Sequence, residues 1–277
     1  MSSMAATLRR TPPLPAVIQA ALIAVLLAIA AACWAVTGDR MDGMDAGPGT
    51  ELGGLGWFLV VWVTMMAAMM LPSLAPMVVG RARIERARGD GSTAAGSTAF
   101  VAGYVASWAA VGLAGYAIVE GVRSLGIGFL DWDAGGPYVA GAVILVAALY
   151  QLTSTKDACL THCRRSEMLL EDWRPGPLGA LRMGIDHGGF CIGCCWAMMA
   201  ALFALGIMSV GWMAFVAALI AIEKLLPWRA VAVRAIAVVL AVLGLAVAFT
   251  PDNVPGLTIP GSSDSMGTMQ MQMEMDR

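Results

Sequence analysis

The sequence has few charged residues for its length, and this scarcity excludes an ordinary water-soluble domain. Asp, Glu, Lys and Arg make up 13% of the 277 residues, whereas apolar residues make up 59%. A typical soluble domain carries about 25% charged residues. The composition therefore predicts an integral membrane protein, and the long apolar runs predict an all-α bundle of transmembrane helices.

Several motifs of well-known protein classes are missing from the sequence. It has no GxxxxGK[ST] phosphate loop and no DKTG-like phosphorylation sequence, which argues against an ATP-driven pump within this chain. The HExxH and GxSxG motifs of zinc peptidases and serine hydrolases are also absent. We find no clear internal repeat of the kind that marks many secondary transporters. These absences favour a binding protein over an enzyme, and nothing predicts nucleic-acid binding.

Seven apolar segments approach the length of about 20 residues that a membrane-spanning helix needs. We predict spans at residues 16–36, 55–79, 99–119, 137–155, 184–205, 209–226 and 230–249, and six spans are also compatible with the pattern. Residues 1–250 would form the transmembrane bundle. Residues 251–277 are rich in Pro, Gly, Ser and Met, and we predict a disordered tail.

The positive charges predict how the bundle is oriented. If the N-terminus is cytoplasmic, every Lys and Arg except Arg40, Arg123 and Arg277 falls on the cytoplasmic side. Such an excess of positive charge is typical of cytoplasmic loops. We therefore expect a cytoplasmic N-terminus and an external C-terminus.

One segment concentrates chemically reactive side chains in this apolar chain. In a helix, His187, Cys191 and Cys195 recur at every fourth residue and share a face, with Cys194 beside them. A single cysteine would be ordinary packing, but clustered thiols with an imidazole suit soft metals. The glycines at 184, 188, 189 and 193 are unfavourable in a helix interior, and they permit close helix approach or a distorted turn.

A second group, Cys159, His162 and Cys163, follows the fourth predicted span. The predicted orientation places it at the same cytoplasmic side as His187 and Cys191. Thiols are kept reduced there, which favours metal binding over a structural disulfide. We expect this group to close a metal site with the first one. Glu223 would either orient a ligating histidine or pair with Lys224, and we favour the ion pair.

Methionines form a third pattern, in the second predicted span. They are Met65, Met66, Met69 and Met70, and they precede Pro72 and Pro76. Methionine often fills gaps in a core, but beside a cysteine site these thioethers are candidates for a metal path. The prolines free backbone carbonyls, which other groups must satisfy.

The C-terminal tail alternates methionine with polar residues. Its candidate ligands are Met266, Met269, Met271 and Met273. Thioethers bind the soft ion Cu(I) in preference to harder divalent ions. We therefore predict copper, as Cu(I), with an external tail that captures it; zinc is the main alternative because Cys and His also bind zinc.

Four sequence motifs together resemble a known bacterial family. They are MMAAMMLPSLAP (65–76), KDACLTHCR (156–164), HGGFCIGCCWAMM (187–199) and the Glu223-Lys224 pair. The combination, and its HGxxCxGCCW motif above all, resembles the bacterial predicted metal-binding integral membrane proteins, a family of unknown function. The resemblance implies a metal-binding protein of several spans, and we expect it in the bacterial inner membrane.

Three functions remain compatible with these patterns. The first is a membrane protein that binds, delivers or transports Cu(I), with a copper-dependent membrane enzyme or a soluble copper-binding protein as its partner. The second is a thiol redox protein that uses Cys194 and Cys195 with Cys191 or Cys159. The third is an accessory subunit of a larger membrane enzyme complex.

Overall fold

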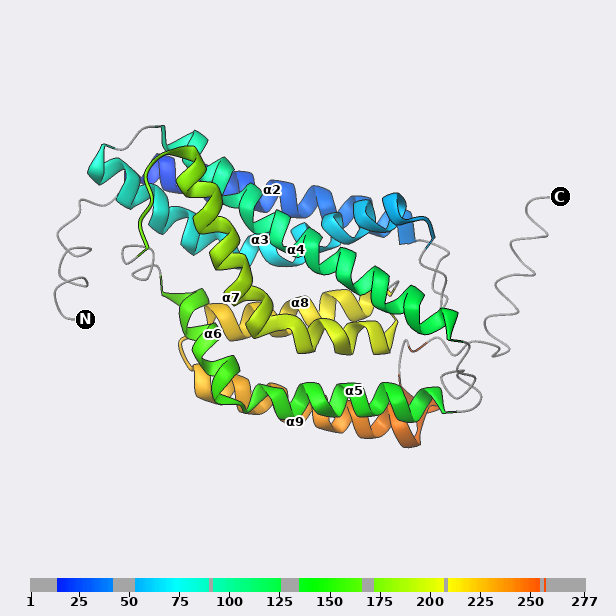
Figure 1. Ribbon diagram of the computed structural model, residues 1–277. Coiled ribbons are helices and arrows are strands. Elements are labelled where there is room, and N and C mark those ends of the chain that lie inside the picture. Colours follow the sequence, from blue (N-terminus) through cyan, green and yellow to red (C-terminus); the bar gives the residue numbers. More distant parts are fainter. Residues whose placement is uncertain are drawn as a thin grey trace.

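The computed structural model describes residues 14–41, 53–89, 92–125, 135–165, 172–206, 209–254 and 257, and these form a bundle of helices (Figure 1). The described residues contain no strand, so the predicted all-α fold is confirmed. The helices are α2 (Ala16–Met41), α3 (Leu55–Arg88), α4 (Thr93–Ser124), α5 (Gly136–Gln151), α6 (Ser154–Arg164), α7 (Gly176–Leu205), α8 (Val210–Leu225) and α9 (Arg229–Phe249), followed by the short 3₁₀ helix η3 (Pro251–Asn253).

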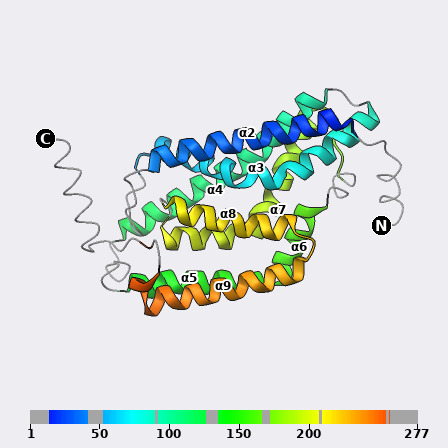
Figure 2. The ribbon, with the colours of Figure 1, turned by 180° about the vertical axis from the view of Figure 1, so that it is seen from behind.

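The helices are arranged around α7 and α8. Helices α2, α3 and α4 lie on one side of them, and α5 and α9 lie on the other (Figures 1 and 2). The most extensive helix contacts join α4 to α7, α5 to α9 and α2 to α3. Helix α7 contacts α4, α5, α6 and α8, so it lies in the middle of the bundle.

The described residues contain five or six candidate membrane spans. Helices α2, α3, α4, α7 and α9 are each long and apolar enough to cross a membrane, and α5 with α6 adds a sixth if the bent pair is one span. Helix α8, the sixth span of the seven-span prediction, has 16 residues and is shorter than the roughly 17–25 residues of a membrane-spanning helix. Large aliphatic side chains such as Val238, Val242 and Leu149 are exposed. This surface is compatible with a membrane protein.

Helix α3 continues through both of its prolines. Pro72 has no N–H to donate to the carbonyl of Ala68, four residues earlier. The indole N–H of Trp34 on α2 donates to that carbonyl instead, at 3.1 Å. The freed group that the sequence predicts is therefore satisfied by a neighbouring helix, which also fixes α2 against α3.

Helices α4 and α7 cross in very close contact because glycines lie at the crossing. A Cβ atom added at Gly184 would lie 2.0 Å from the carbonyl oxygen of Phe100, and one added at Gly103 would lie 2.1 Å from that of Leu181. An added Cβ atom at Gly188 would lie 2.5 Å from the side-chain oxygen of Ser107. Gly189, by contrast, has nothing within 4 Å of its Cβ position. The predicted close approach is thus correct for Gly184 and Gly188.

A break after α5 redirects the chain toward α7. Helices α5 and α6 meet at an angle of 68°. Thr153 stabilises the junction, since its hydroxyl donates to the carbonyl of Tyr150 at 2.8 Å and accepts from the N–H of Lys156 at 3.3 Å. The fourth predicted span therefore ends earlier than expected, and the residues that follow it form α6.

Candidate metal centre

The cysteines of α7 lie on the buried side of that helix. Cys191, Cys194 and Cys195 are each at most 1% exposed, and His187, one turn before Cys191, is 8% exposed. Their burial follows from the glycines at the α4 crossing, which bring the α4 backbone over the same side of α7. The stripe predicted from the sequence is thus enclosed by protein.

Helix α6 adds a third sulfur to two sulfurs of α7. The Sγ atoms of Cys163, Cys191 and Cys194 all lie within 4.8 Å of one another, and all three residues are buried. Cys163 and Cys194 Sγ are 3.7 Å apart. We call these residues the thiol group. Its sulfurs are close enough to bind one ion together.

Two side chains from other helices contact the sulfur of Cys191. The ammonium of Lys224 on α8 donates to Cys191 Sγ at 2.9 Å and also lies 3.5 Å from the hydroxyl of Ser73 on α3. The hydroxyl of Tyr104 on α4 shares a hydrogen bond of 3.0 Å with the same sulfur. Periodicity within a single helix does not reveal contacts between different helices, so spacing alone does not predict these two.

The predicted ion pair between Glu223 and Lys224 is wrong. Glu223 binds the ammonium of Lys156 on α6 at 2.8 and 2.9 Å, and both side chains are 1% exposed. Consecutive residues on a helix point about 100° apart, so Glu223 faces α6 while Lys224 faces α7 and α3. The side-chain amide oxygen of Gln151 also accepts from Lys156. This buried pair joins α6 to α8 beside the thiol group.

The remaining predicted ligands lie around the thiol group. Cys195 Sγ is 3.3 Å from Cys194 Sγ. Cys159 is partly exposed and its sulfur packs where a side chain at Gly193 would lie. His187 packs between the rings of Phe100 and Tyr104, and His162 stacks on Phe190 with ring centres 4.1 Å apart. Among the described residues, the metal-sized cluster contains the three thiols and neither histidine.

The four methionines of α3 are buried in the same core cluster as the α7 cysteines. Two contacts show which residues of α3 and α7 lie at the same height in the bundle. Ser73 lies at the height of Cys191, since both contact Lys224, and Trp62 packs on Phe203 with ring centres 5.6 Å apart. Because both helices rise by the same distance per residue, Met70 lies level with Cys194, and Met66 lies level with Met198. The other two are Met65 and Met69, at 1% and 3% exposure.

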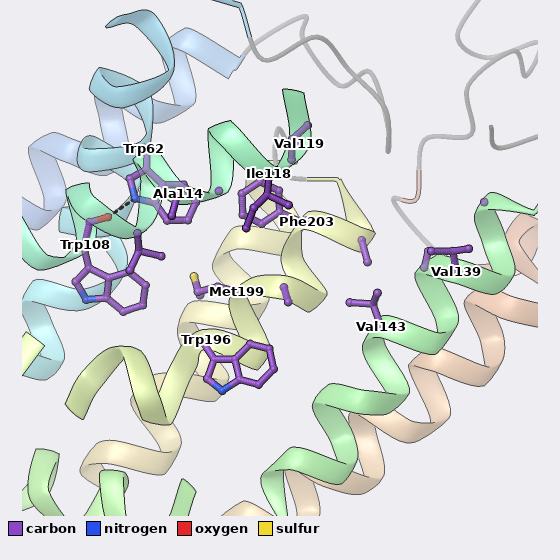
Figure 3. A pocket seen from close by; sticks show the side chains of 16 residues that line it. Trp62, Trp108, Ala114, Ile118, Val119, Val139, Val143, Trp196, Met199 and Phe203 are labelled. Carbon is purple, nitrogen blue, oxygen red and sulfur yellow. Dashed lines mark hydrogen bonds between the residues drawn. The ribbon is translucent and has the colours of Figure 1, made fainter. Parts of the chain in front are cut away.

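A large apolar cavity lies apart from the thiol group, between α3, α4, α5 and α7 (Figure 3). It has a volume of about 570 Å³. Trp62, Trp196 and Phe203 line one side and Val139 and Val143 of α5 face them, as the close-up shows. Met199 supplies the one sulfur among its lining residues. The cavity therefore offers no set of metal ligands.

The tail predictions are not tested, because residues 258–277 lie outside the described part of the chain. This holds for all four candidate ligands of the tail. They are Met266, Met269, Met271 and Met273.

The sequence matches a protein-family model. The family model of PpoB2, described as a copper chaperone, matches residues 59–247, which is most of the chain and includes every cysteine of α6 and α7. The chain belongs to the PpoB2 copper chaperone family. No curated protein and no solved structure gives a significant match.

Membership of the PpoB2 family agrees with the chemistry of the thiol group. The earlier resemblance implied a bound metal without specifying which one, and the copper chaperone family indicates copper. Three buried thiols are soft ligands of the kind that copper in its reduced state prefers. The family and the cysteine cluster together support copper binding.

Proposed function

We propose that this protein is a membrane-embedded carrier of Cu(I) that holds the ion at Cys163, Cys191 and Cys194 and delivers it to a recipient protein. The observation that carries the proposal is the convergence of three buried sulfurs, from two helices, within 4.8 Å. Cys195, next to Cys194, is a fourth sulfur available during transfer. Delivery to a recipient is supported by the chaperone description of the family.

The ligand set supports Cu(I) over zinc. A structural zinc site is nearly always completed by four tetrahedral ligands from Cys, His or carboxylates. The thiol group offers three sulfurs, and neither histidine belongs to it in the described part of the chain. Cu(I) is satisfied by a small number of soft sulfur ligands. The ammonium of Lys224 adds a positive charge beside the sulfurs, which compensates the negative charge of a thiolate complex.

Copper binding by the purified protein tests this proposal. We expect the reduced protein in detergent to retain one Cu(I) against a competing Cu(I) chelator. Cys163→Ser, Cys191→Ser and Cys194→Ser should each weaken binding at least about a hundredfold, since even the loss of a group that only supports a ligand costs 10–100-fold. Added Zn²⁺ should not displace the ion.

The matched controls are the two cysteines that lie away from the thiol group. Cys159 is on α6, one turn before Cys163, and Cys33 is on α2. Cys159→Ser and Cys33→Ser should leave Cu(I) affinity unchanged. Undiminished Cu(I) binding by a Cys163→Ser/Cys191→Ser/Cys194→Ser variant would rule out the proposed site.

We further propose that the bundle lies in the bacterial inner membrane with its N-terminus in the cytoplasm and its C-terminus outside. The distribution of Lys and Arg supports this orientation. The thiol group then lies toward the cytoplasmic side. In a cysteine-free background, Ala87→Cys should resist a membrane-impermeant maleimide added to intact cells, and Ser262→Cys should react. The opposite labelling pattern would mean that the orientation is inverted.

A further inference from the structure

The two histidines lie together at a small pocket one turn away from the thiol group. The pocket has a volume of about 40 Å³, enough for an ion or a water molecule. His162, His187, Met77 and Met183 line it and supply two imidazoles and two thioethers. The sequence predicts both histidines in one site with the cysteines, whereas in the structure both line a separate pocket.

The pocket leads from the protein surface to buried soft ligands. Met77, Met183 and His187 are 2%, 3% and 8% exposed. Asp172 and Arg165 at its rim are exposed, and Asp186 is half-exposed and paired with Arg174 at 3.0 Å. The His187 imidazole contacts the rings of Phe100 and Tyr104 and also lines the pocket. A buried imidazole of this kind is available to a ligand.

Three helices connect this pocket to the thiol group over one turn or less. On α7, His187 precedes Cys191 by four residues, which is about 6 Å along the helix. On α6, His162 and Cys163 are consecutive. On α3, Met77 lies one turn from Ser73, which contacts the Lys224 ammonium that donates to Cys191.

We propose that the pocket formed by His162, His187, Met77 and Met183 is a second Cu(I) site, through which the ion passes to and from the thiol group. The proposal rests on the proposed Cu(I)-carrier function. Neutral imidazole and thioether ligands hold Cu(I) weakly and exchange it quickly, whereas thiolates hold it tightly. On transfer inward, bonds from copper to nitrogen and thioether sulfur break and bonds to thiolate sulfur form. Each thiol that becomes a ligand releases its proton to water, and copper remains Cu(I).

The rate of copper loading distinguishes an exchange site from a structural pocket. Cu(I) supplied as its bicinchoninate complex should load the Met77→Leu/His187→Leu variant at least about tenfold more slowly than the unmodified protein, with the same final occupancy of the thiol group. Met77→Leu/Met183→Leu, which conserves volume, should slow loading in the same direction. Met199→Leu, on α7 at the apolar cavity, should load at the normal rate.

A second measurement isolates the pocket from the thiol group. The Cys163→Ser/Cys191→Ser/Cys194→Ser variant should still bind one Cu(I) weakly, with nitrogen and thioether sulfur in its X-ray absorption spectrum. Adding Met77→Leu and His187→Leu should abolish that binding.

Each outcome separates the two proposals. Unchanged loading rates in both pocket variants, or no copper on the three-serine variant, would overturn the exchange site and leave the thiol site standing. Failure of the unmodified protein to retain Cu(I) would overturn the carrier function and the exchange site together.

Discussion

Gly184→Leu is expected to destroy both the stability of the bundle and its Cu(I) binding. The contact at Gly184 is with the backbone carbonyl of Phe100, only 2.0 Å from the Cβ position, so no side-chain rotation relieves it. The α4 and α7 backbones must separate instead. Overpacking of a core typically lowers the free energy of unfolding by about 1–3 kcal/mol. Because the backbones themselves must move here, we expect a loss at or above the upper end of that range.

The same separation would disturb the thiol group. Helix α4 carries Tyr104, whose hydroxyl is 3.0 Å from Cys191 Sγ, and α7 carries two sulfurs of the thiol group. Thermal unfolding in detergent and retention of Cu(I) would both report the change. Gly189→Leu is the matched control, because Gly189 is exposed on the same helix with nothing within 4 Å. A Gly184→Leu protein with normal unfolding temperature and normal copper binding would contradict the observed crossing.

Among single substitutions that remove a charge near the thiol group, Lys156→Met is expected to destabilise the protein most. It leaves the carboxylate of Glu223 buried without its partner, and both side chains are 1% exposed. Removing one partner of a buried ion pair costs on the order of 3–5 kcal/mol, because the remaining charge is not solvated. Copper affinity should fall as well, since the pair holds α6, and therefore Cys163, against α8.

A double variant separates this effect from a simple loss of contact. In Lys156→Met/Glu223→Met, no charge is left buried, and we expect recovery of most of the lost stability. The adjacent residue supplies a control, since Asp157 pairs with Arg229 at 3.1 Å near the surface, with side chains 59% and 35% exposed. Asp157→Asn should cost no more than about 1 kcal/mol. A double variant less stable than Lys156→Met would contradict this account of the pair.

All the helices except α6 could be predicted from the sequence, because each contains a long apolar run, whereas α6 is polar. The predicted bounds were less accurate where a helix continues into polar residues. Helix α3 runs to Arg88, beyond the predicted end at residue 79, and α7 begins at Gly176, before residue 184. Hydropathy detects the apolar part of a helix, whereas backbone hydrogen bonds continue through charged residues wherever nothing terminates them.

The candidate site could be predicted only as far as periodicity within a helix extends. The shared face of His187, Cys191 and Cys195 follows from spacing alone. Cys163 is the α6 cysteine that lies close to Cys191 and Cys194. Its position depends on the bend after Gln151, and no sequence motif predicts that bend. The contact of Lys224 with Cys191 depends on how three helices pack against one another. Residue spacing in a single sequence does not predict that packing.

The pairing of α5 with α9 has a consequence for the order of events during synthesis. Gly141 of α5 packs directly on Gly244 and Ala248 of α9, but α6, α7 and α8 are all made between them. A nascent chain that has reached Arg229 already contains every cysteine of α6 and α7, yet it lacks the helix that covers Gly141. The sulfur ligands are thus synthesised before the bundle can be completed, and α5 lacks its partner helix until α9 follows.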